Sequence, residues 1–276
     1  MQHQPTIDLV IPPFTQLNTP YPSTTYLARW LHKHDIPYTQ RDLGIELALR
    51  IYSREGLSRI YQWVENRSSE LPDEGWRWLA LQDHYLSTVG PVIAFLQGKD
   101  RTLAQRIATG RWLPVGPRLE RAELSHFGTM GIEDSARYMA TLYLEDIADA
   151  ITELVDPGFG FSRYQHHLAT GPVHFGPIAQ RLSETTVIDT LLDELIDQIP
   201  SEIVCLSVPF PGTLYGALRI GNRIKRSGRT VWMGGGYVNT ELRDVNEPQL
   251  WDCVDALCYD DGEGPLLELY KEYVGK

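Results

Sequence analysis

Cysteines, long apolar runs and positive charge are all scarce in this chain, and each scarcity excludes a class of protein. Only three cysteines occur in 276 residues, Cys205, Cys253 and Cys258, too few for a disulfide scaffold. Cys253 and Cys258 have no second cysteine pair or neighbouring histidine, so their spacing does not favour a zinc or iron–sulfur site. No apolar run approaches the length of a membrane span, and the first residues lack the pattern of a signal peptide. We therefore expect a cytoplasmic protein with reduced thiols and no membrane segment.

The charge balance restricts the partners that the chain is expected to bind. Lys and Arg total 25 against 36 Asp and Glu, which gives a net charge of −11 at pH 7. Nucleic acids and anionic membranes attract basic surfaces, so we expect neither a nucleic-acid partner nor a membrane partner. With 42% hydrophobic residues, a chain of this length buries a sizeable core and forms one large domain or two modest ones.

Both ends of the chain alternate strand-like and helix-like segments. The apolar run Ile7–Ile11 ends at two prolines, residues 23–34 have helical spacing with Ser23 or Thr24 available as N-cap, and residues 37–43 resemble a strand. Toward the C-terminus, three further strands are predicted between helices, at residues 203–208, 230–233 and 256–259. Strands that alternate with helices form parallel sheets. The sequence thus predicts an α/β fold with a flavodoxin-like, doubly wound, parallel five-stranded sheet.

The segment between the second and third predicted strands has few strand-like runs. Its apolar residues recur at helical spacing in four stretches separated by Gly/Pro clusters, namely residues 45–63, 76–96, 103–109 and 135–155. We interpret residues 45–185 as a large all-helical insertion after the second strand. Residues 1–44 and 186–276 then form the α/β domain.

The segments that follow the five strands form the candidate site, because open parallel sheets bind ligands beyond the carboxyl ends of their strands. These segments are rich in Gly, Pro, Ser, Thr and Asn, which let backbone approach a ligand and offer amides or hydroxyls. They are residues 12–22, 42–44, 207–213, 234–239 and 260–263. Gly234–Gly236 lack the GxGxxG pattern and a Walker lysine, and Ser207 is not in a GxSxG elbow. The sequence therefore indicates no catalytic residue and no metal ligand.

Taken together, the strand-end segments resemble those of a known family. The relevant stretches are LVIPPFTQLNTPYP at residues 9–22, VCLSVPFPGT at 204–213, TVWMGGGYVN at 230–239 and ALCYDDGEGP at 256–265. Their order and spacing are similar to those of the N-terminal cobalamin-binding domain of cobalamin-dependent radical SAM enzymes. The resemblance covers the two outer parts of the chain, about half its length. It implies a cobalamin whose corrin lies flat over the carboxyl edge of the sheet.

The resemblance also implies which residues approach the cofactor. A corrin needs an apolar shelf with close-packed backbone, and the nucleotide tail of cobalamin needs small residues and hydroxyls. Carried over by position, the cofactor-binding residues are Phe14, Thr15, Asn18, Tyr21, Asp42, Ser207, Pro209, Phe210, Thr213, Gly234, Gly235, Gly236, Tyr237, Val238 and Glu263.

Two departures from the family pattern limit what this chain is expected to do. It has no Asp-x-His-x-x-Gly, the motif that supplies a histidine to cobalt in many cobalamin proteins. Its three cysteines cannot make the Cys-x-x-x-Cys-x-x-Cys spacing that holds a [4Fe–4S] cluster for S-adenosylmethionine. Radical chemistry would therefore need a cluster-binding barrel beyond Lys276 or on a separate chain, so the chain is not catalytically complete alone.

Two other functions are compatible with the same fold, since this architecture hosts many chemistries. In the first, the fold persists without binding a corrin and serves as a docking module, with no cavity wide enough for the cofactor. In the second, the chain is a small-molecule or nucleotide-sugar enzyme. That function is favoured by a narrow pocket around Gly234–Tyr237 with Asp42 or Glu263 facing it.

Overall fold

A computed structural model describes residues 4–14, 17, 21–67, 69, 71–122, 130–160 and 175–275. Its contacts divide the chain into two compact units. Unit 1 consists of Met1–Leu47, Gly160–Thr185 and Asp189–Lys276, and unit 2 consists of Ala48–Phe159 and Thr186–Ile188. Among the described residues, no helix is long and apolar enough to cross a membrane.

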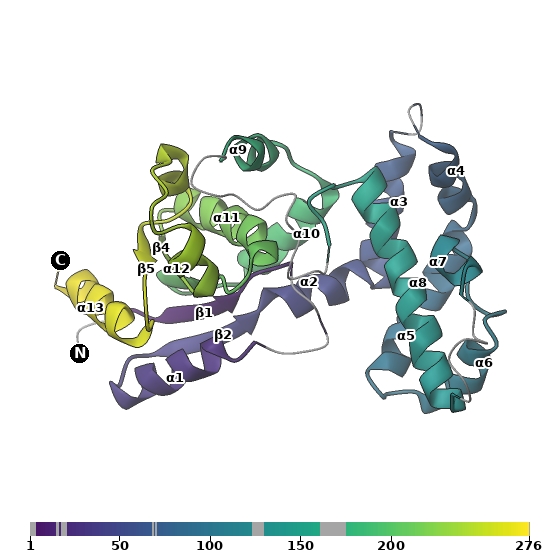
Figure 1. Ribbon diagram of the computed structural model, residues 1–276, viewed down its shortest axis with the longest axis horizontal. Helices are drawn as coiled ribbons and strands as arrows, with labels where there is room; N and C mark the ends of the chain where they lie inside the picture. Colours follow the sequence, from purple (N-terminus) through teal and green to yellow (C-terminus); the bar gives the residue numbers. More distant parts are fainter. Residues whose placement is uncertain are drawn as a thin grey trace. The chain divides into compact units, whose positions relative to one another are not determined.

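Unit 1 is built on a parallel sheet in the strand order β2-β1-β3-β4-β5 (Figure 1). The strands are β1 (Ile7–Ile11), β2 (Tyr38–Asp42), β3 (Ile203–Ser207), β4 (Thr230–Gly234) and β5 (Ala256–Cys258). All five strands that the sequence predicts are present, within one or two residues of their predicted ends. This confirms the flavodoxin-like α/β fold, with a helical segment from α2 to α10 between β2 and β3.

Helices cover both faces of the sheet because the chain winds outward from β1 and β3 in opposite directions. On one face, α1 (Ser23–Lys33) and α13 (Glu263–Val274) pack on Leu9, Cys205 and Trp232 in a shared apolar core. On the other face, α11 (Pro211–Arg226) contacts β3 and β4. The remaining helical elements of unit 1 are α9 (Gly176–Ser183), α12 (Gly236–Glu241) and the 3-10 turn η5 (Pro248–Asp252).

Unit 2 contains helices only, among the residues described. They are α3 (Arg54–Glu65), α4 (Asp73–Ala80), α5 (Gln82–Leu96), η2 (Arg101–Leu103), α6 (Ala104–Ala108), α7 (Pro117–Glu120) and α8 (Ile132–Leu154). Helices α2 (Leu43–Ile51) and α10 (Val187–Ile196) contain residues of both units. Figure 1 shows α8 as the longest helix, alongside α5.

Two predicted helices of this region are each divided in two. The predicted helix at residues 45–63 breaks after Ile51, because the Ser53 hydroxyl accepts a hydrogen bond from Gly56 N at 2.9 Å and starts α3. Gly56 permits this tight junction, since a Cβ there would lie 1.9 Å from the Arg50 carbonyl oxygen. The predicted helix at 76–96 likewise divides into α4 and α5, near Leu81.

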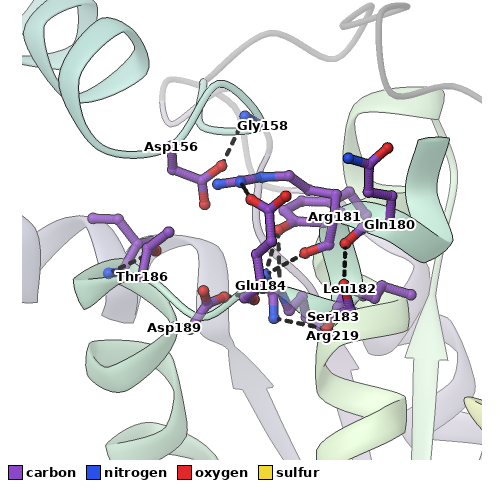
Figure 2. Close-up of polar contacts among 12 residues, drawn as sticks. Asp156, Gly158, Gln180, Arg181, Leu182, Ser183, Glu184, Thr186, Asp189 and Arg219 are labelled. Carbon is purple, nitrogen blue, oxygen red and sulfur yellow. Dashed lines mark hydrogen bonds and ion pairs between the residues drawn. The ribbon is translucent and has the colours of Figure 1, made fainter.

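A buried arginine fixes the segment that leads back into the sheet of unit 1. The Arg219 guanidinium on α11 pairs with Asp189 of α10 at 2.8 Å. It also donates hydrogen bonds to the carbonyl oxygens of Arg181, Leu182 and Glu184, at 2.9, 3.3 and 2.6 Å (Figure 2). One side chain thereby satisfies three main-chain acceptors at the C-terminal end of α9 and just after it.

Candidate functional site

The sheet register brings three strand ends of unit 1 side by side. Ser207 at the end of β3 pairs with Gly234 of β4, and Gly234 pairs with Cys258 of β5. Two residues earlier along β3 and β4, Cys205 and Trp232 form a second row with Leu9 of β1. Because side chains alternate between faces, both rows point to the face covered by α1 and α13.

A cavity of about 270 Å³ lies over these two rows. Its floor is the sheet, where Leu9, Cys205, Trp232 and Cys258 line it. Helices α1 and α13 and the turn from β5 to α13 supply the remaining walls, including Leu27 and Leu266. The cavity is thus apolar at the floor and opens at the carboxyl edge.

Glycines keep this edge open. Gly234 lies between Ser207 and Cys258 and has no side chain to fill the space, while a Cβ there would lie 3.2 Å from the Cys258 Cβ. Gly235 has φ of 118°, a region that favours glycine. A Cβ at Gly235 would lie 2.6 Å from the Val208 carbonyl oxygen. Gly236 also lines the cavity, so backbone groups border the opening.

Two hydroxyls meet at the wall between the sheet and α1. The Ser23 Oγ lies 2.6 Å from the Ser207 Oγ, within hydrogen-bond distance. Ser23 is therefore not the N-cap that the sequence suggested, since α1 begins at Ser23 and its N-cap, Pro22, makes no side-chain capping bond. Both serines line the cavity, where they present a polar pair beside an apolar floor.

The opposite wall is acidic and held in a fixed conformation. Asp260, Asp261 and Glu263 line the cavity at the turn from β5 to α13. The Asp260 N–H donates to Asn239 Oδ1 at 2.6 Å, and the Asp260 carboxylate pairs with Arg243 at 2.5 Å. These contacts hold Asp260 at φ of 61°, an uncommon backbone conformation for a residue other than glycine.

The two thiols of the floor stay protonated at neutral pH. Burial raises the pKa of the Cys205 thiol well above its ordinary value and that of Cys258 to about 11. A thiol must ionise to act as a nucleophile or a metal ligand. Cys205 and Cys258 therefore serve as small, polarisable packing groups in this cavity.

Five of the expected cofactor-binding residues come together in the cavity, Ser207, Gly234, Gly235, Gly236 and Glu263. Other expected residues have local structural contacts outside it. Asp42 Oδ1 accepts a hydrogen bond from Ile45 N at 3.0 Å, at the start of α2. The Thr213 hydroxyl donates to the Phe210 carbonyl oxygen at 2.8 Å in the first turn of α11.

The remaining expected residues are mostly buried around the strand ends. Phe14 N donates to the Gly212 carbonyl oxygen at 3.3 Å, and Tyr21 packs edge-on against Phe210 at 5.6 Å. Pro209, Tyr237 and Val238 are buried and do not line the cavity. Thr15 and Asn18 lie outside the residues that the structure describes. The assignment of all these residues to a cofactor stays a prediction.

Sequence reasoning missed the contribution of α1. Ser23, Thr24 and Leu27 line the cavity, but the sequence prediction placed the site only in the segments after the strands. A signal for them was available, because the helix of a β–α–β unit starts beside the carboxyl end of its strand. Residues on the sheet-facing side of that first helical turn are therefore candidates as well.

No known relative adds to this description. Within the described part of the chain, no group of three or more His, Cys, Asp and Glu side chains is arranged to hold a metal ion. No family model, curated protein or solved structure matches the chain. What the structure establishes is an α/β fold with a parallel five-stranded sheet and a cavity at its carboxyl edge.

Proposed function

We propose that unit 1 is a cobalamin-binding module of a radical SAM system. The observation that carries this proposal is the cavity lined by Ser207 and Gly234, which lies at the edge where doubly wound sheets bind ligands. In this proposal the nucleotide tail of the cofactor fills the cavity. The corrin lies outside it, over the glycines of the carboxyl edge.

The size and lining of the cavity are suited to the nucleotide tail of cobalamin and not to the whole cofactor. Its volume of about 270 Å³ is near the lower end of ligand pockets, which span about 300–1,000 Å³. A flat heterocycle suits the apolar floor of Leu9, Trp232 and the two thiols. A corrin is too large for this space, and the open glycine edge offers it backbone contact instead.

The chain's own residues would orient the cofactor and exclude water. The Ser23–Ser207 hydroxyl pair offers a donor and an acceptor to the tail, and Leu27 and Leu266 cover its apolar faces. A bound cobalamin supplies the cobalt chemistry of methyl transfer or of another difficult C–H reaction. The [4Fe–4S] cluster and S-adenosylmethionine would come from a barrel beyond Lys276 or on a partner chain.

A second candidate is a small ligand with a heterocycle and a ribose but no corrin. It is favoured by the narrowness of the cavity and by its acidic wall of Asp260, Asp261 and Glu263, since carboxylates accept hydrogen bonds from sugar hydroxyls. The docking function without a ligand is the third candidate, and a cavity too narrow for a corrin is what it predicts. The open edge at Gly234, Gly235 and Gly236 favours a ligand over it.

Retention of hydroxocobalamin tests the proposal. The purified chain is mixed with hydroxocobalamin or with cobinamide, which lacks the nucleotide tail, then desalted, and the visible spectrum is recorded. We expect one retained cobalamin per chain and loss of cobinamide. Leu27→Trp fills the cavity and should weaken retention at least about tenfold, whereas Thr25→Trp on the exposed side of α1 should not.

One result would reject the cobalamin module and another would reject only the placement of the tail. If no corrin is retained, the proposal fails for this chain. If cobinamide is retained as well as cobalamin, the chain binds the corrin but the cavity does not hold the tail. Binding of a benzimidazole or purine nucleoside that is lost in Leu27→Trp, without corrin retention, would make the second candidate the leading function.

A further inference from the structure

The first turn of α1 has backbone donors that nothing in the described part of the chain uses. The helix begins at Ser23 after Pro22, which makes no side-chain capping bond, and its first turn holds no acidic residue. Thr25 N and Tyr26 N donate to the Pro22 carbonyl oxygen at 3.0 and 3.2 Å, whereas the N–H groups of Ser23 and Thr24 have no acceptor among the described residues. Ser23 and Thr24 both line the cavity of unit 1. Free N–H groups at the positive end of a helix dipole attract an anion.

A buried threonine is the second, independent sign of a ligand at this helix end. Thr24 is only 6% exposed and lines the cavity. Its hydroxyl has no hydrogen-bond partner among the described residues, yet it is not sealed from solvent. A hydroxyl in a largely buried position is normally hydrogen-bonded, so a ligand oxygen that accepts its proton is favoured.

The serine pair adds a further donor beside Thr24. The Oγ atoms of Ser23 and Ser207 lie 2.6 Å apart, and neither hydroxyl has another partner among the described residues. One hydroxyl donates to the other, so the pair keeps one O–H free. Ser207 is 7% exposed and lies at the end of β3, beside Gly234 at the mouth of the cavity. Backbone N–H and hydroxyl groups that converge in this way suit the oxygens of an anion.

The charge around the cavity limits which anion fits. No Lys, Arg or His occurs among the described residues that line it. Asp261 and Glu263 line the opposite wall, and neither has a cationic partner within the part of the chain described. This acidic turn lies close to α1, since a Cβ at Gly262 would lie 3.3 Å from Leu27 Cδ2. Like charges repel, so an anion with one negative charge is favoured over an anion with two.

From these contacts we infer that the first turn of α1 binds a phosphodiester, a phosphoryl group with a single negative charge. Its oxygens accept hydrogen bonds from the N–H groups of Ser23 and Thr24, the Thr24 hydroxyl and the free hydroxyl of the Ser23–Ser207 pair. The inference deepens the proposed function and rests on it, because the phosphate of the cobalamin tail is such a diester. A free nucleotide with an esterified phosphate has the same chemistry.

Isothermal titration calorimetry of the full chain tests the charge preference without a corrin. The probes are the benzimidazole riboside, its phosphate monoester and its methyl phosphate diester. We expect the diester to bind at least about tenfold more tightly than the riboside, and the monoester to bind more weakly than the diester at about pH 7.5. The second pKa of a phosphate monoester is near 6, so the monoester has one charge at about pH 5 and its affinity should approach that of the diester.

Two adjacent threonines provide a matched pair of variants. Thr24→Val keeps the shape but removes the hydroxyl, so it should weaken diester binding and hydroxocobalamin retention about tenfold and leave riboside binding unchanged. Thr25→Val makes the same change on the exposed side of α1 and should alter neither. The urea midpoint of Thr24→Val should not fall, because this hydroxyl has no partner among the described residues. A purely structural role would lower it.

The outcomes separate this inference from the cobalamin module. The phosphodiester site is overturned if the diester binds no more tightly than the riboside, or if Thr24→Val and Thr25→Val weaken diester binding equally. If hydroxocobalamin is not retained but the diester binds in a Thr24-dependent way, the module fails and the phosphodiester site stands. If Thr24→Val retains hydroxocobalamin as well as the parent does, the module stands and the phosphodiester site fails.

Discussion

The two units each enclose a cavity, but they make it by different means. In unit 1 the cavity floor is set by backbone pairing, because the register of β3, β4 and β5 places Ser207, Gly234 and Cys258 in one row. In unit 2 the cavity is set by side-chain packing between helices, with Trp78 and Tyr85 among its lining residues. A site built on a sheet edge is therefore fixed by topology, whereas a site between helices depends on each side chain.

The units also differ in the polar groups that they bury. Unit 1 buries a pair of opposite charges, Arg219 and Asp189, between α11 and α10. The carboxylates that unit 2 buries, Asp146 and Asp156, accept hydrogen bonds from backbone N–H groups instead, and its core is rich in phenols such as Tyr143. We expect substitution of the buried ion pair in unit 1 to change stability more than removal of a buried tyrosine hydroxyl in unit 2.

The largest effect is expected from Arg219→Met. The side chains of Arg219 and Asp189 are only 12% and 10% exposed, so methionine leaves the buried carboxylate without this cation and three carbonyl oxygens without their donor. The free energy of unfolding should fall by about 3–5 kcal/mol. Urea titration measures the loss, and hydrogen exchange should locate it in α9 to α11.

The double variant Arg219→Met/Asp189→Leu separates the cost of an unpaired buried carboxylate from the cost of the lost hydrogen bonds to the carbonyl oxygens. Replacing both charges by apolar groups should restore part of the stability, since the uncompensated carboxylate is gone. If Arg219→Met lowers the free energy of unfolding by less than about 1 kcal/mol, the Arg219–Asp189 pair behaves like a surface ion pair. The buried charges of unit 1 would then not distinguish its stability from that of unit 2.

The sequence was most informative where local pattern and topology coincide. The apolar run Ile7–Ile11 and the run at 203–208 have no polar alternation beyond Asp8 and Ser207, which is the pattern of strands covered on both faces. Once the strands are known, the right-handed crossover between parallel strands specifies which strand ends lie side by side. Ser207 and Gly234 could thus be predicted as neighbours from sequence alone.

The helical part of the site could not be predicted in the same way. Periodicity shows which face of a helix is buried, but not which helix it meets. Trp78 and Glu153 are far apart in the chain, and their shared cavity depends on how α4 and α8 pack. The division of 45–63 at Ser53 likewise depends on a capping bond that the apolar spacing does not reveal.

Asp8→Asn is expected to have the second-largest effect on stability, and it should stabilise the protein where Arg219→Met destabilises it. Asp8 is fully buried, and neither carboxylate oxygen has a hydrogen-bond partner among the residues described. Burial raises the pKa of Asp8, and nearby Ser201, Arg41 and Arg229 offset this only in part. Removing the charge should raise the free energy of unfolding at pH 7 by about 1–3 kcal/mol.

The pH dependence of this gain gives a direct check. The pKa of Asp8 is higher in the folded state than its ordinary value of 3.8, so the folded state binds the proton more tightly than the unfolded state does. The protein therefore loses stability as the pH rises from 3.8 to the raised pKa. The advantage of Asp8→Asn should therefore be full at pH values above the raised pKa and shrink as the pH falls through it in urea titrations. A gain that is constant from neutral to acid pH would show that the charge is not its cause.

A smaller effect is expected from Tyr143→Phe in the core of unit 2. The Tyr143 hydroxyl lies 3.0 Å from Thr88 Oγ1 and donates to the Tyr85 carbonyl oxygen at 3.3 Å. Phenylalanine keeps the ring that stacks on Tyr85 at 5.4 Å, so only hydrogen bonding is lost. The cost should be about 0.5–1.5 kcal/mol by urea titration. A cost equal to that of Arg219→Met would remove the contrast between the two cores.

The smallest effect is expected from Arg137→Gln on the surface of α8. Arg137 pairs with Glu133 one turn earlier at 3.0 Å, and both side chains are 45% exposed. Arg137 holds the pKa of Glu133 below its ordinary value of 4.5, so the contribution is present at neutral pH and disappears as pH falls through the lowered pKa. Solvent and salt screen such pairs, so the variant and the parent should unfold at nearly the same urea concentration, and at the same one in about 1 M salt. A loss that persists in about 1 M salt would show that Arg137 stabilises unit 2 through a contact that salt does not screen, such as its packing over the Phe95 ring at 6.0 Å, and not through its ion pair with Glu133.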